Sequence, residues 1–119
     1  MTSPLPQLSI RIVFGEEDAL GKGKIQLLER IAETGSISAA ARSMDMSYRR
    51  AWQLLEALNH TFGRPLAQTR KGGNQRGGAT LTPAGIAVCE TYRRLQARAA
   101  DLLADELTTL SSLRRPGAS

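Results

Sequence analysis

Large apolar side chains occupy every second position near the N-terminus, over residues 8–14. The apolar set consists of Leu8, Ile10, Ile12 and Phe14, and the residues between them are Ser9, Arg11 and Val13. A period of two with β-branched residues predicts a half-buried strand over Leu8–Phe14. The next segment, Gly15–Gly23, is polar and rich in glycine, which predicts a loop.

Three segments with helical spacing follow. Apolar residues predict a helix from Lys24 to Thr34, which Gly35 ends. Ser38 is the expected N-cap of a short alanine-rich helix that runs to about Met44. After a break at Asp45 and Met46, Ser47 is the expected cap of a helix that Gly63 ends. Its inward stripe is Ala51, Leu55, Leu58 and Phe62, with Trp52 beside it in the core.

The second half of the chain predicts a hairpin and a long helix. Leu66–Lys71 and Ala79–Thr82 are expected strands, joined by a flexible glycine-rich loop over Gly72–Gly78. Thr82 and Pro83 form a favourable helix start. The helix is expected to continue to Leu113, with one apolar stripe made of Ile86, Cys89, Tyr92, Leu95, Ala99, Leu103, Leu107 and Leu110.

This order of elements predicts a single domain over residues 1–119, mainly α with a small β component. Two helices around a short break, followed by a strand–loop–strand hairpin, are typical of a winged helix-turn-helix. The expected parts are a helix-turn-helix over about residues 36–63, a wing over about residues 66–82 and a long C-terminal dimerisation helix over about residues 83–113, preceded by the N-terminal strand.

The distribution of charge along the chain narrows the classes of function that fit the sequence. The 119 residues carry a formal net charge of +5. Between residues 36 and 80, seven basic and two acidic side chains give +5, whereas nine of each cancel elsewhere. A concentrated basic surface attracts polyanions, chiefly nucleic acid or an acidic membrane face, although a basic segment can also be merely solvated.

The expected recognition surface is the start of the helix that Ser47 caps. Its outward residues are Tyr48, Arg49, Arg50 and Gln53. Arginine can bond a guanine edge in the major groove, and glutamine an adenine edge. Phosphate contact or solvation remains open for both arginines, and partial burial remains open for Tyr48. Ser47, with the exposed amides of its helix start, is an expected phosphate contact, and Ser38 joins the expected DNA-binding residues.

The expected wing is the second basic element. Its cations are Arg70, Lys71 and Arg76, with no acidic residue between Arg64 and Thr80. Glycines allow a backbone to approach a sugar-phosphate ridge closely, and arginine suits a minor groove or phosphates. The alternative is a mobile surface hairpin without a ligand.

Other chemistry finds little support in the sequence. His60 and Cys89 are the only residues of their types, so they cannot assemble a zinc site in one chain. We therefore expect no catalytic residue, no metal and no cofactor, and hence no enzyme. A lone cysteine, the absence of a signal-peptide pattern and the absence of a long apolar run favour a cytoplasmic protein without membrane contact.

Two blocks of the sequence are familiar. Residues 25–42 resemble the start of bacterial winged-helix regulators, including the LysR type. Ser-Tyr-Arg-Arg-Ala-Trp at residues 47–52 and the glycine-rich stretch at residues 69–82 resemble the N-terminal DNA-binding domain of molybdate-responsive (ModE-type) regulators. The resemblance extends from about Leu8 to Leu95.

The resemblance implies a homodimer that binds double-stranded DNA near genes for molybdenum uptake or use. It implies pairing through the first strand and the helix after the wing, so the expected pairing residues are Ile86, Cys89, Tyr92, Leu95, Leu103 and Leu110. Full-length members carry a C-terminal molybdate-binding domain. This sequence has no length left for one, so we expect a stand-alone form that does not itself bind molybdate. Two alternatives remain open, a protein-interaction module and an oxyanion sensor at the dimer interface.

Overall fold

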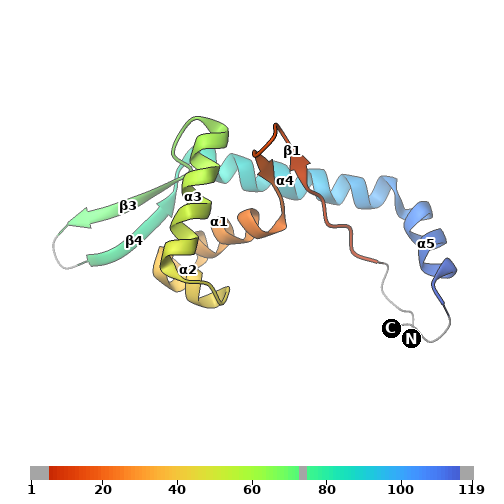
Figure 1. Cartoon of the computed structure of the whole chain (residues 1–119), viewed down its shortest axis with the longest axis horizontal. Coiled ribbons are helices and arrows are strands. Elements are labelled where there is room, and N and C mark those ends of the chain that lie inside the picture. Colours follow the sequence, from red (N-terminus) through yellow and green to blue (C-terminus); the bar gives the residue numbers. More distant parts are fainter. Residues whose placement is uncertain (1–5, 73–74, 116–119) are drawn as a thin grey trace.

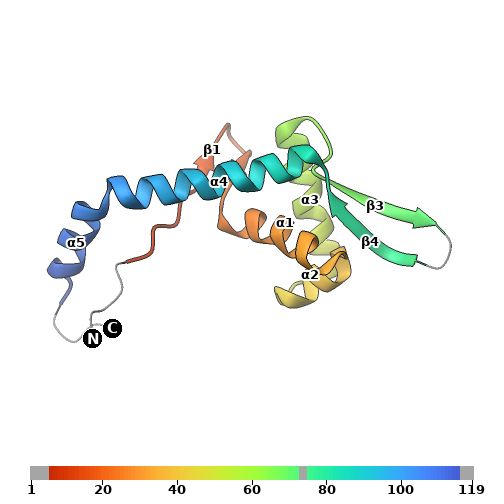
Figure 2. The same cartoon turned by 180° about the vertical axis from the view of Figure 1, so that it is seen from behind.

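A computed structural model describes residues 6–72 and 75–115 of the chain, with the side chains of residues 71–77 left out of the description. The elements follow in the order β1 (Ile12–Val13), β2 (Ala19–Leu20), α1 (Lys22–Thr34), α2 (Ile37–Ser43), α3 (Tyr48–Phe62), β3 (Ala67–Gly72), β4 (Gln75–Leu81), α4 (Pro83–Leu102) and α5 (Ala104–Leu113). The molecule is elongated, with the β3–β4 hairpin at one end of α4 and α5 at the other (Figures 1 and 2).

The core lies where α1, α2 and α3 meet. α1 contributes Ile25, Leu27, Leu28 and Ile31, all fully buried. The facing sides of α2 and α3 supply two small residues and two leucines, namely Ala40, Ala51, Leu55 and Leu58. Alanine at the contact lets the α2 and α3 backbones approach closely. α3 packs against both α1 and α2, and the side of α3 that carries Arg49, Arg50 and Gln53 is exposed.

The N-terminal segment departs from the predicted strand. Burial alternates from Leu8 to Val13, but only Ile12–Val13 pairs with a strand, β2, inside the segment predicted to be a loop. The backbone farther upstream bonds to α4 instead. Tyr92 Oη donates to Ile10 O at 2.6 Å, and Gln96 Nε2 donates to Leu8 O at 3.0 Å. The predicted loop was also too long at its other end, because α1 already begins at Lys22.

The helix-turn-helix has the expected turn and one corrected cap. Gly35 ends α1 with a φ of 71°, and Ser36 directly after it caps α2, its Oγ accepting from Ala39 N–H at 3.1 Å. The prediction of Ser38 as the cap was therefore wrong by two residues. Asp45 takes the left-handed conformation expected at the break, with a φ of 54°. Ser47 is confirmed as the cap of α3, its Oγ accepting from Arg50 N–H at 3.0 Å.

The wing is a longer hairpin than predicted. β3 and β4 are antiparallel, with an irregular register between Arg70 and Gly72. Of the predicted loop over Gly72–Gly78, Gly72 and residues 75–78 lie in strands, since glycine can also adopt the extended conformation. Its remaining residues, 73 and 74, fall outside the described part of the chain. Ala79 N–H donates to Gly35 O at 2.8 Å, which attaches the wing to the turn between α1 and α2.

The predicted C-terminal helix is in fact two helices. Thr82 caps α4 as expected, accepting from Gly85 N–H at 3.1 Å. The helix ends at Leu102, and α5 turns away from its axis after Leu103 (Figure 1). No residue of α5 is buried, so no packing within the described chain holds α5 in line with α4. The elements nevertheless form the predicted winged helix-turn-helix, mainly α with a small β component.

Candidate nucleic-acid interface

The start of α3 projects its polar residues to solvent. Arg49, Arg50 and Gln53 are exposed. The buried stripe of α3 fixes this orientation, because residues that face the core at helical spacing leave the opposite side free. Ser47 is exposed as well, and its hydroxyl accepts from Arg50 N–H while its own proton remains available to a ligand. The predicted recognition residues therefore share one surface.

The aromatic residues of α3 divide between surface and core. Tyr48 is 48% exposed, and its ring packs edge-on against Trp52 at a centroid separation of 6.2 Å. This contact orients a ring that can still reach a ligand. Trp52 and Phe62 are partly buried and pack against the core, as expected. Phe62 also meets Phe14 edge-on at 5.8 Å, which ties the β1–β2 hairpin to the end of α3.

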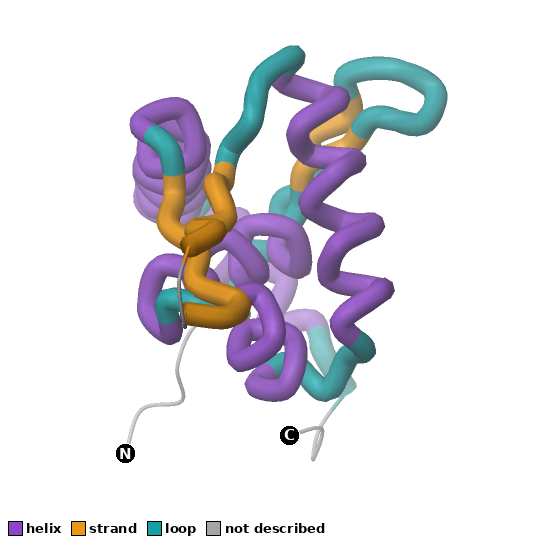
Figure 3. Tube along the Cα trace, turned by 90° about the vertical axis from the view of Figure 1, so that its left-hand side faces the viewer, coloured by secondary structure: helices purple, strands orange, loops and turns teal. Residues whose placement is uncertain are grey.

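The wing lies beside this surface. In the view from the wing end, the β3 and β4 strands are nearest the viewer and α4 is seen end-on (Figure 3). Arg70 is exposed in β3, and its side chain lies over Gly78 of β4, where an added Cβ would be 3.5 Å from Arg70 Cβ. Lys71 and Arg76 lie in β3 and β4, but their side chains are outside the described part. Ser38 lies half-buried in the first turn of α2.

A basic hollow on the other side of α3 was missed by the sequence analysis. It has a volume of about 430 Å³, and its basic lining residues are Arg11, Lys22, Lys24 and Arg50. Three of these come from the N-terminal quarter of the chain, where acidic residues balance the charge along the sequence. No signal in the sequence placed them beside α3, because that juxtaposition depends on how α1 packs.

The residues of the predicted pairing stripe on α4 and α5 divide into an exposed set and a buried set. Ile86, Leu95, Leu103 and Leu110 are 37–62% exposed. Cys89 and Tyr92 are buried at 8% and 1% exposure in the core of the chain itself, so their assignment to the pairing surface is corrected. Burial raises the pKa of Cys89 from 9.0 to about 11, and the Glu29 carboxylate adds to the increase. The thiol is therefore protonated at neutral pH.

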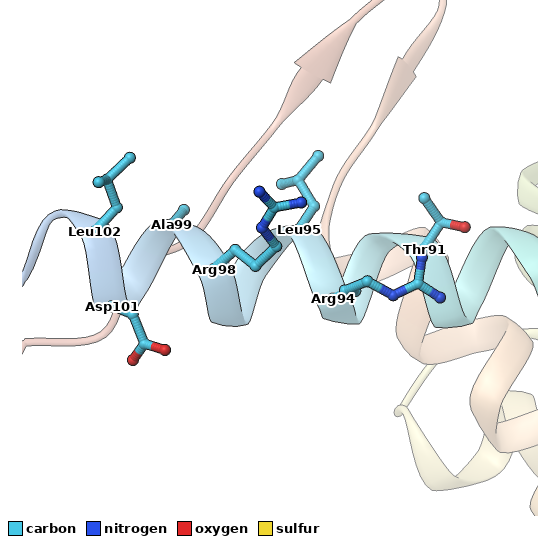
Figure 4. A pocket seen from close by; sticks show the side chains of 7 residues that line it. All are labelled: Thr91, Arg94, Leu95, Arg98, Ala99, Asp101 and Leu102. Atoms are coloured by element: carbon cyan, nitrogen blue, oxygen red, sulfur yellow. The ribbon is translucent and has the colours of Figure 1, made fainter.

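The outer side of α4 is hollowed, and its lining mixes apolar residues with Thr91, Arg94, Arg98 and Asp101. Its lining includes Leu95, Ala99 and Leu102, and Leu95 and Leu102 point to the same side of the helix whereas Asp101 points to the other (Figure 4). Farther round the helix, Arg93 forms a two-point ion pair with Glu29 of α1, with N–O distances of 2.6 and 2.8 Å. That hydrogen-bonded pair raises the pKa of Arg93 and fixes α4 on α1.

No helix among the described residues has the length and apolar character needed to cross a membrane.

Proteins with curated descriptions are similar to this chain in sequence, and three of them are described below. The chain is 42% identical over 84 residues to the molybdenum-pterin-binding protein MopB of Rhodobacter capsulatus, and this match covers 71% of the chain and 31% of MopB. It is 40% identical to the molybdenum transport protein ModE of Herbaspirillum seropedicae, covering 73% of the chain and 32% of that protein.

The third is the DNA-binding transcriptional dual regulator ModE of Escherichia coli K12, at 35% identity, with 70% of the chain and 33% of the regulator covered. The chain thus spans about a third of the length of these relatives.

Solved structures share the fold. The CbnR DBD–DNA complex matches with a TM-score of 0.56 and 25% identity, over 75% of this chain and 95% of that one. A LysR family transcriptional regulator matches with a TM-score of 0.60 and 20% identity, over 84% of this chain and 32% of that one.

The family model for bacterial regulatory helix-turn-helix proteins of the LysR family matches residues 23–86, which extend from α1 through the wing to the start of α4. That match covers more than half of the chain and includes the exposed start of α3. The family is one of DNA-binding regulators and not a class of enzymes. This chain belongs to the bacterial regulatory helix-turn-helix proteins of the LysR family.

Proposed function

We propose that this chain binds double-stranded DNA as a homodimeric transcriptional regulator of genes for molybdenum transport or use, acting in the cytoplasm. The observation that carries the proposal is the exposed start of α3, with Arg49, Arg50 and Gln53 free of core contacts beside a basic hairpin. Curated relatives described as molybdenum transport proteins and as a DNA-binding regulator support the choice of target genes.

The start of α3 enters the major groove. An α-helix fits that groove, and side chains at its N-terminus reach base edges. Arg49 and Arg50 bond guanine or a phosphate, and Gln53 bonds adenine. Ser47 donates its hydroxyl proton to a phosphate, with Ser38 on the neighbouring helix as a second contact. Arg70, Lys71 and Arg76 follow the flanking backbone or minor groove.

A second copy pairs along the outer side of α4. Leu95, Ala99 and Leu102 lie on this side, and Leu102 is 81% exposed. A contiguous exposed apolar surface rimmed by polar residues is typical of a protein–protein contact. Pairing here orients two copies of α3 towards successive major grooves, about one helical turn of DNA apart or a multiple of it.

Selection of bound fragments from genomic DNA tests the function. Fragments near genes for molybdenum transport or use should be enriched, and enrichment of unrelated fragments alone would overturn the choice of targets. On a selected fragment, Arg49→Ala or Arg50→Ala should cost about 1–3 kcal/mol where the arginine bonds a base. Arg30→Ala, exposed on α1, is the matched control and should leave the affinity unchanged. Full affinity in both α3 variants would refute the recognition surface.

A further inference from the structure

The basic hollow beside α3 brings together cations that are far apart in the sequence. Arg11 comes from the segment before β1, Lys22 and Lys24 from the start of α1, and Arg50 from the start of α3. Glu17 is the only acidic residue in the lining. With four basic side chains and one acidic, the lining carries a formal charge of +3.

The cations are held in place but remain available to a ligand. Arg11, Lys22 and Arg50 are exposed and form no ion pair within the described residues. The stem of Arg11 lies over Gly21, where an added Cβ would be 3.8 Å from Arg11 Cγ. Lys24 is half-buried, and its Nζ donates to Ala19 O at 2.9 Å, which fixes its charge inside the hollow.

The hollow lies across α3 from the wing. The wing extends to one side of α3 and the β1–β2 hairpin, which borders the hollow, lies on the other side (Figures 1 and 2). Arg50 belongs both to the start of α3 and to the lining, so the hollow is continuous with the recognition surface. The major groove that receives a helix has a phosphate backbone on each side. The wing can follow one of these backbones.

We propose that this hollow is a second phosphate-binding surface, which holds the DNA backbone on the side of α3 away from the wing. The proposal rests on the proposed function of DNA binding and adds to it a contact outside the helix-turn-helix and the wing. Duplex DNA is the occupant because the hollow adjoins the recognition surface and presents several cations to a ligand with many phosphates. Each phosphate neutralised in this way releases condensed counterions, which makes the affinity depend on salt.

The salt dependence of binding tests the proposal in the full chain. Arg11→Ala/Lys22→Ala removes two exposed cations that make no side-chain hydrogen bond within the described residues, so the fold should be retained, as a thermal melt can verify. Since each phosphate contact contributes about 0.9 on duplex DNA, the slope of log Kobs against log salt should become shallower by about 1.8 for each bound protomer, or about 3.6 for the proposed dimer. The loss should be similar on selected and random duplexes, because phosphates carry no sequence information.

Two further variants complete the test. Arg30→Ala/Arg64→Ala removes the same charge from exposed positions outside the lining and should leave the slope unchanged. Glu17→Gln removes the acidic residue of the hollow and should raise the affinity. A double variant at Arg11 and Lys22 with the wild-type slope, measured while Arg49→Ala weakens binding, would overturn the proposal and leave the DNA-binding function intact. A wild-type chain that binds no duplex at low salt would overturn both.

Discussion

Gly85 gives the sharpest prediction about how the wing is attached to α4. A Cβ added at this residue would lie 2.0 Å from Leu66 O and 3.0 Å from Leu66 C. Side-chain carbons need at least about 3.0 Å, so α4 and the base of β3 must separate by about 1 Å in Gly85→Ala. The hydrogen bond from Thr82 N–H to Leu66 O, 3.0 Å long, spans the same gap and would be stretched or lost.

Gly85→Ala changes the free energy of unfolding through contributions of opposite sign. Overpacking of this kind costs about 1–3 kcal/mol, and a lost hydrogen bond about 1 kcal/mol more. Alanine in place of glycine inside a helix stabilises the folded state by about 1 kcal/mol. We therefore expect Gly85→Ala to lower the free energy of unfolding by about 2 kcal/mol, or the Tm by about 8 °C for a domain of this size.

Urea and thermal unfolding of Gly85→Ala beside Gly23→Ala provide the measurement. Gly23 is exposed in the first turn of α1 with nothing within 4 Å of its added Cβ, so alanine there should be neutral or stabilising by up to about 1 kcal/mol. A Gly85→Ala variant as stable as the wild type would refute the reasoning, because the separation of α4 from Leu66 could not then be costly.

Three further predictions concern a cap, the pairing surface and the buried thiol. Ser47→Ala should cost about 1 kcal/mol in urea unfolding because it removes the α3 cap, whereas Ser38→Ala, which removes no cap, should cost less; equal losses would contradict the cap assignment. Leu102→Asp should convert the dimer to a folded monomer in sedimentation equilibrium, because its side chain is exposed in the single chain; an unchanged dimer would exclude this surface. The pKa of Cys89 in the folded chain, about 11, lies above its ordinary value of 9.0, so the stability it confers is complete below about pH 9 and falls as pH rises towards 11. Wild-type stability should thus fall more steeply over that interval than that of Cys89→Ala in pH-dependent unfolding, and parallel curves would contradict the raised pKa.

Residues that cap or end individual helices were sufficient to predict much of the fold from the sequence. The bounds of α3 follow from Ser47 as its cap and Gly63 as its stop, and the start of α4 follows from Thr82 and Pro83. These residues act on backbone groups within a few positions, so their effect is visible in the sequence. The outward set on α3 was predictable for the same reason, because helical spacing alone assigns its buried and exposed faces.

Long-range packing accounts for what the sequence did not reveal. The N-terminal segment bonds to Tyr92 and Gln96, more than 80 positions away. Its period of two was correct for burial from Leu8 to Val13 and wrong at Phe14, which is 54% exposed, and it was misleading about the partner. The break at Leu103 has no glycine or proline to signal it. The basic hollow likewise arises only when α1 brings Lys22 and Lys24 beside Arg50. For the N-terminal segment and the hollow, the deciding contacts join segments that are distant in the chain, whereas α5 has no buried residue that would hold it in line with α4.

Hydroxyl-radical footprinting on a selected genomic fragment tests the central claim most directly. If a dimer places the start of each α3 in a major groove, the wild-type chain should protect two backbone regions about one helical turn apart, or a multiple of it. Arg49→Ala/Arg50→Ala should lose both at the same protein concentration. Protection that the double variant retains unchanged, or a wild-type chain that protects no region, would contradict DNA recognition through α3.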